Sequence, residues 1–98
     1  MVVVRNSFQV KFGKMREALG FMKENMARAV AAGEKPGRVL TDLTGAFYTL
    51  VMELEFDSLA DFDKRMARVM AEPGWHESYQ KFAALVDSGR REIYKVVG

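Results

Sequence analysis

The chain has 98 residues, of which 49% are hydrophobic and 29% charged, with no Cys, a single His and a formal net charge of +2. This composition excludes collagen-like and disordered chains, disulfide scaffolds, Cys-ligated zinc sites and any site that needs two imidazoles from one chain. We expect one domain over residues 1–98. The apolar run near Met1 is too short for a signal peptide or a membrane span, which predicts a cytoplasmic protein without membrane contact.

The first predicted element is a strand over Val2 to Phe12. Its residues alternate between an apolar side, with Val4, Phe8, Val10 and Phe12, and a polar side, with Arg5, Ser7, Gln9 and Lys11.

A helix is predicted between Gly13 and Gly33. There the apolar residues recur at the three-and-four spacing of one helix face, as Met15, Ala18, Leu19, Met22, Met26, Ala29 and Val30.

A β-hairpin is predicted next, with strands at Arg38 to Thr44 and Phe47 to Phe56 joined by a turn at Gly45-Ala46. In the longer strand one face is apolar throughout, with Tyr48, Leu50, Met52, Leu54 and Phe56. The other face is mixed, with Phe47, Thr49, Val51, Glu53 and Glu55.

The last third of the chain predicts a split helical unit and a closing strand. Ser58 is placed to cap a helix that Pro73-Gly74 ends. A further helix is expected from Trp75 to Val86, ending at Ser88-Gly89, followed by a strand from Arg90 to Val97.

This order of elements predicts an α+β fold of the ferredoxin-like βαββαβ type. Its four-stranded antiparallel sheet would have strands one and three in the centre and both helical units on one face. The other face would then display Phe47, Val51 and some of Val39, Leu43, Ile93 and Val97, with the facing of strands two and four left open. Covering that apolar area favours a homodimer, since a symmetric partner presents the same face.

Several stretches resemble one superfamily: Phe8–Lys14, Val39–Phe47, Leu54–Phe62, Pro73-Gly74-Trp75 and Gly89–Tyr94. Over nearly the whole chain the sequence resembles the dimeric α/β-barrel superfamily, within it small NIPSNAP-like proteins and the antibiotic-biosynthesis monooxygenase type. The resemblance implies two subunits joining their sheets around a central cavity. Some members oxidise aromatic substrates without metal or flavin, and some bind haem.

The face opposite the helices offers one candidate site. Arg5 and Ser7 are expected to approach Thr49 and Glu53 there, where Arg5 would orient an anionic or carbonyl-bearing ligand and Glu53 would serve as a base. Phe47 and Val51 would add apolar walls. The alternative reading of Arg5 and Glu53 is an intersubunit salt bridge at the dimer seam, which is the commoner use of such a pair.

His76 is the remaining candidate for acid–base chemistry or for an axial haem ligand, although a capping or surface role is commoner at such a helix start. Trp75 and Tyr79, one helical turn apart, are candidates for the cavity mouth, against a packing role on the preceding helix. No cofactor is predicted, and haem is left open. The seven Met are best explained as flexible core residues.

The residues of the predicted third strand exclude nucleic-acid recognition. An RNA-recognition domain of the same strand order needs spaced aromatics on its third strand, where this chain offers only Phe47, and Glu53 and Glu55 would repel phosphate. Three hypotheses remain. The favoured one is a homodimer that binds a small, partly apolar organic molecule in its shared cavity. The others are a cofactor-independent monooxygenase-like enzyme with a small aromatic substrate and a structural or regulatory dimer without ligand.

Overall fold

A computed structural model describes all 98 residues and contains four strands and three helices. In chain order these are β1 (Val2–Val10), α1 (Met15–Ala31), β2 (Arg38–Thr41), β3 (Thr49–Phe56), α2 (Leu59–Met70), α3 (Trp75–Ala83) and β4 (Val86–Lys95). The strands form one antiparallel sheet in the order β2-β3-β1-β4. The predicted ferredoxin-like fold, with strands one and three in the centre, is confirmed.

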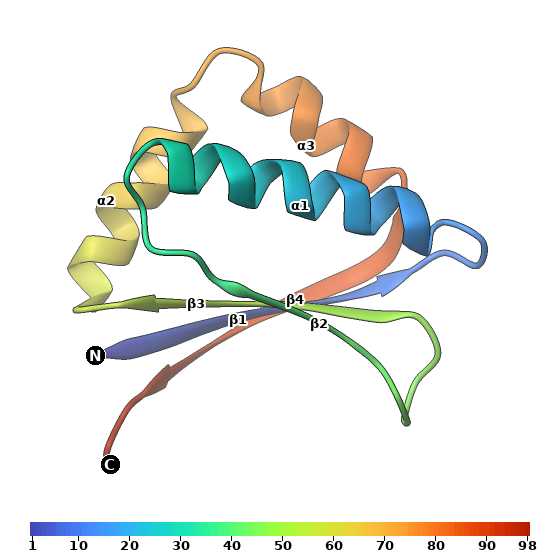
Figure 1. The fold of residues 1–98 in the computed structure, drawn as a ribbon, viewed down its shortest axis with the longest axis horizontal. Coiled ribbons are helices and arrows are strands. Elements are labelled where there is room, and N and C mark those ends of the chain that lie inside the picture. The colour runs from blue at the N-terminus through green and yellow to red at the C-terminus, as the bar shows by residue number, and fades with distance from the viewer.

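The three helices lie on one side of the sheet and leave the other side bare (Figure 1). We call the bare side the open face. None of the helices combines the length and the apolar character needed to cross a bilayer.

The hydrophobic core lies between the sheet and α1. Its centre consists of Val10 and Leu50 from the sheet, Ala18 and Met22 from α1 and Phe82 from α3. The Phe8 and Phe82 rings pack edge to face with their centroids 4.8 Å apart, and the Phe21 ring stacks on Phe82 with a centroid distance of 5.1 Å. These contacts follow the predicted alternation of β1, which turns Val4, Phe8 and Val10 toward the helices.

The helix break and the helix cap follow the sequence signals. The Ser58 side chain accepts a hydrogen bond from the backbone N–H of Asp61 at 3.2 Å, as expected of an N-cap residue. Gly74 separates α2 from α3 with φ of 83°, a left-handed conformation that Gly adopts without steric cost.

The predicted hairpin was too long on both strands. β2 ends at Thr41 and β3 begins at Thr49, so residues 42–48 form a loop instead of a two-residue turn. Tyr48 has φ of 60°, which interrupts an extended strand, and Phe47 therefore lies in the loop with 78% of its surface exposed. Phe12, predicted on the core side of the first strand, is also exposed and packs edge-on against Tyr48 at 4.9 Å.

The predicted boundary between the third helix and the last strand was also wrong. α3 ends at Ala83, and β4 already begins at Val86, opposite Val10. Ser88 and Gly89, predicted to end the helix, are strand residues that pair with Gln9 and Phe8. The Phe8 ring lies so close to Gly89 that a side chain there has no room, which explains a glycine within a strand.

The register fixes which way the outer strands face. Val39 pairs with Met52 and Ile93 with Val4, so both side chains lie on the helix side, whereas Leu40 lies on the open face. Leu43 is in the 42–48 loop and Val97 lies beyond β4. The open face is consequently more polar than predicted, and the apolar area that it leaves uncovered is smaller.

Candidate functional site

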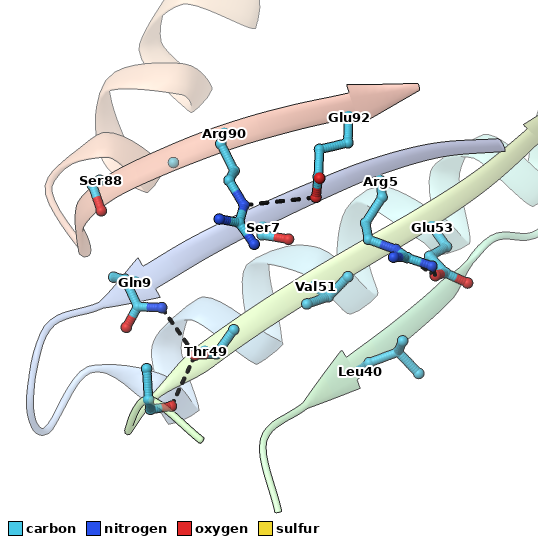
Figure 2. Close-up of a pocket in the computed structure, with 12 residues that line it drawn as sticks. Arg5, Ser7, Gln9, Leu40, Thr49, Val51, Glu53, Ser88, Arg90 and Glu92 are labelled. Atoms are coloured by element: carbon cyan, nitrogen blue, oxygen red, sulfur yellow. Dashed lines mark hydrogen bonds and ion pairs between the residues drawn. The ribbon is translucent and has the colours of Figure 1, made fainter. Parts of the chain in front are cut away.

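A hollow of about 720 Å³ lies on the open face and takes residues from all four strands. Figure 2 shows its polar character, with Val51 and Leu40 as the labelled apolar side chains. The lining residues are Arg5, Ser7, Gln9, Leu40, Ala46, Thr49, Val51, Glu53, Ser88, Gly89, Arg90 and Glu92. Of the predicted site residues, Arg5, Ser7, Thr49, Val51 and Glu53 are brought together here.

Glu53 is the one buried charged residue of the chain, with 8% of its side chain exposed. Its Oε2 accepts a hydrogen bond from Nε of Arg5 at 2.8 Å and lies 2.7 Å from Nη2 of the same guanidinium, and its Oε1 accepts a hydrogen bond from Nη2 of Arg38. The hydrogen bonds from Arg38 and Arg5, in that order, lower the pKa of Glu53 below its ordinary value. The predicted approach of Arg5 to Glu53 is confirmed.

This pairing changes the chemistry that Glu53 offers. Both carboxylate oxygens are occupied, and a carboxylate with a lowered pKa is a weak proton acceptor. To act as a base, Glu53 would have to release at least one guanidinium. The arrangement is better suited to holding Arg5 and Arg38 in fixed positions, each with N–H groups that Glu53 does not engage.

A second polar group lies on β4. The Tyr94 hydroxyl donates a hydrogen bond to Oε2 of Glu92 at 2.6 Å, which raises the pKa of Tyr94. The guanidinium carbon of Arg5 lies 5.4 Å from the centroid of the Tyr94 ring, a cation–π distance, and Nε of Arg90 lies 3.6 Å from Oε1 of Glu92. Arg5 therefore joins the carboxylate of β3 to the aromatic ring of β4.

Sequence reasoning missed Arg38, Arg90, Glu92 and Tyr94, because the facing of strands two and four was undetermined. For the three residues of the last strand, the sequence spacing could have indicated that they act together. Arg90, Glu92 and Tyr94 are two residues apart and must share one face. Only the pairing of Glu92 with Arg5 shows that this face is the open one.

The opposite end of the hollow is held by Thr49. Its hydroxyl accepts a hydrogen bond from Nε2 of Gln9 at 2.9 Å and donates one to the carbonyl oxygen of Ala46 at 2.9 Å, while its backbone N–H donates to Oδ1 of Asp42 at 2.8 Å. Thr49 thereby fixes the 42–48 loop to the rim. Ser7 and Val51, paired across β1 and β3, lie between this end and Glu53 (Figure 2).

The other predicted site residues lie elsewhere. Trp75 and Tyr79 stack on each other at 5.3 Å on the helix side, where they line a second cavity. His76 is exposed on α3 and lines neither hollow, and Phe47 lies in the 42–48 loop. No three carboxylate or imidazole groups gather closely enough to hold a metal ion.

Comparison with known proteins decides the family. Residues 4–98 match the family model of NIPSNAP. The chain belongs to the NIPSNAP family. No curated protein matches this NIPSNAP chain.

Solved structures show the same fold. A NIPSNAP family protein from Agrobacterium tumefaciens is similar with a TM-score of 0.84 and 18% identity, over 98% of this chain and 92% of that one. A NIPSNAP domain protein from Burkholderia xenovorans gives 0.82 and 15%, over 99% and 95%. A protein described as an antibiotic biosynthesis monooxygenase gives 0.76 and 14%, over the whole of both chains. At these identities the likeness concerns the fold alone.

Proposed function

We propose that two copies of this NIPSNAP chain pair through their open faces, and that the chamber between the sheets binds a small organic molecule with a carboxylate or carbonyl group. The observation that carries the proposal is the hollow over all four strands, with Glu53 buried between Arg5 and Arg38 on a face that no helix covers. A twofold partner would cover this face with an identical one.

The donors of the hollow support the choice of ligand. Arg5 uses its Nε and Nη2 for Glu53, so Nη1 keeps its N–H groups for a further acceptor. Arg90 extends from the opposite side of the hollow, and the Ser7 hydroxyl lies near it in Figure 2. Guanidinium and hydroxyl donors converging on one space suit a carboxylate or a polarised carbonyl oxygen. Leu40 and Val51 would contact an apolar part of the molecule.

The pairing step is tested by sedimentation velocity over a concentration series. Wild type is expected to sediment as a dimer. Val51→Lys, which places a charge in the middle of the open face, should shift it to the monomer. Ala27→Lys on the exposed side of α1 is the matched control and should stay dimeric. A wild-type monomer at every concentration would overturn the proposal.

The binding step is tested with benzoate, with benzyl alcohol as the neutral analogue. NMR titration of the Val51 methyl groups is expected to show saturable shifts with benzoate. Arg90→Gln should weaken benzoate binding about tenfold, since a charge-assisted hydrogen bond is lost. Arg16→Gln on α1, outside the hollow, should have no effect. Equal shifts with both probes, or with wild type and Arg90→Gln, would contradict a guanidinium site.

A further inference from the structure

The helix side of the sheet contains a second cavity, of about 440 Å³. It shares no lining residue with the hollow on the open face. It lies between α1, the turn from α2 to α3 and the helix side of β3. Its apolar walls include Phe21, Met26, Met52, Leu54, Val69 and Trp75. Each of these side chains is only partly buried, so the helices leave apolar surface facing an accessible space. A volume of this size lies within the range of small-molecule sites.

The cavity has a charged rim on one side. Nη2 of Arg65 lies 2.7 Å from Oε2 of Glu34, and Arg68 pairs with the other oxygen of the same carboxylate. The Glu34 and Arg65 side chains are 17% and 19% exposed, so this pair is largely withdrawn from solvent. Among the lining residues four are basic, Arg28, Lys35, Arg65 and Arg68, and two are acidic, Glu34 and Glu72. The rim therefore carries an excess of positive charge.

We propose that this helix-side cavity binds an amphipathic monocarboxylate, with its apolar body among the Met and aromatic side chains and its carboxylate at Arg65 and Arg68. This proposal does not depend on ligand binding in the hollow on the open face or on the pairing of two copies.

The side chains of the cavity suit such a ligand. Met26 and Met52 are unbranched and adapt to the shape of an aliphatic or aromatic body. Trp75, stacked on Tyr79, offers a flat apolar wall at the α2–α3 turn. Since Glu34 engages only part of the donor set of its two arginines, a carboxylate at the rim finds further N–H groups there. The positive charge that would pair with the ligand carboxylate thus lies at the rim of the cavity, and the interior of the cavity stays apolar.

Trp75 makes the test direct, because it is the only Trp of the chain. Its fluorescence is followed during titration with laurate and, separately, with dodecanol. A saturable change with laurate, and affinity for dodecanol lower by about tenfold or more, is the expected result. No saturable change with laurate, or equal affinity for the two probes, would overturn the proposal.

Two pairs of variants locate the site. Ala29→Leu, which adds volume inside the cavity, should abolish the laurate response, whereas Ala27→Leu on the exposed side of the same helix should retain it. Arg68→Gln, at a largely exposed position where folding is not at risk, should weaken laurate about tenfold without changing dodecanol. Arg16→Gln should match wild type. Retained laurate binding in both Ala29→Leu and Arg68→Gln would place the ligand elsewhere and overturn the proposal.

The two binding proposals fail separately. Ala29→Leu should leave the dimer and the benzoate titration unchanged, and Val51→Lys should leave the Trp75 response to laurate unchanged. Circular dichroism of each variant confirms that the fold is retained. Loss of the laurate response in Val51→Lys would contradict a site contained within one subunit.

Discussion

Gly89 of β4 lies directly opposite Phe8 of β1, and a Cβ atom at Gly89 would come within 2.7 Å of Cδ1 of the Phe8 ring. The Phe8 ring cannot move away freely, because it packs at a near-right angle against the Phe82 ring, with the two centroids 4.8 Å apart. The absence of a side chain at residue 89 is what allows Phe8 to reach the core from the middle of the sheet.

Gly89→Ala is therefore expected to destabilise the fold by about 1–3 kcal/mol through overpacking, measured as a lower urea midpoint at an unchanged slope. Gly20→Ala is the control, and it is expected to change the free energy of unfolding in the opposite direction. Gly20 lies within α1 with open space around its Cβ position, so alanine should stabilise the protein by about 0.5–1 kcal/mol. A Gly89→Ala variant as stable as wild type would mean that the Phe8 ring has room to turn aside.

Glu53 should make the stability depend on pH. Its pKa is lowered in the folded protein, so its contribution is present above the ordinary value of 4.5 and is lost as the pH falls through the lowered folded value. Glu53→Gln is expected to cost about 2 kcal/mol at neutral pH, since hydrogen bonds from two guanidinium groups to a charge are weakened. The difference from wild type should shrink in acid, as measured by urea unfolding across the acidic range.

Glu55→Gln provides the matched control for that experiment. Glu55 lies two residues further along β3, is exposed, and pairs with Lys35 at 3.3 Å. Such a surface pair contributes about 0–1 kcal/mol. If Glu55→Gln cost as much as Glu53→Gln, the burial of Glu53 between its two arginines would not be the source of the effect.

Ser58 sets the start of α2 through its hydrogen bond from the Asp61 backbone N–H. Ser58→Ala is expected to lower the free energy of unfolding by about 1 kcal/mol, because that N–H loses its partner. Ser58→Asn retains an acceptor for that N–H and places no second carboxylate beside the Asp61 side chain, to which the Ser58 hydroxyl donates at 3.0 Å, so it should restore most of the loss. Thermal unfolding followed by circular dichroism measures both variants, and equal losses in the two would argue against a capping role.

Tyr94 should titrate above its ordinary value of 10.0, because its hydroxyl donates a hydrogen bond to the Glu92 carboxylate. Glu92→Gln removes that negative charge and is expected to lower the pKa of Tyr94 toward 10.0. NMR titration of the Tyr94 ring measures the shift. An unchanged pKa for Tyr94 would show that the hydrogen bond is not formed in solution.

Much of the fold was readable from local patterns. The alternation of β1, the three-and-four spacing of α1, the cap at Ser58 and the break at Pro73-Gly74 each involve neighbours in sequence, so their physics is local. The errors arose where distant residues decide. Tyr48 takes a left-handed conformation that its type does not favour, and the chain from Val86 to Gly89 joins the sheet because β1 offers it backbone partners.

The candidate site divides in the same way. Alternation along two strands was enough to predict that Arg5, Ser7, Thr49, Val51 and Glu53 share one face once those strands pair side by side in antiparallel fashion, as β1 and β3 do. It did not determine that Arg38 reaches the free oxygen of Glu53, or that Trp75 and Tyr79 face the helix side. Those placements depend on the register of β2 and on how α3 packs. They are set by contacts between residues far apart in the chain, which no local pattern of residue types encodes.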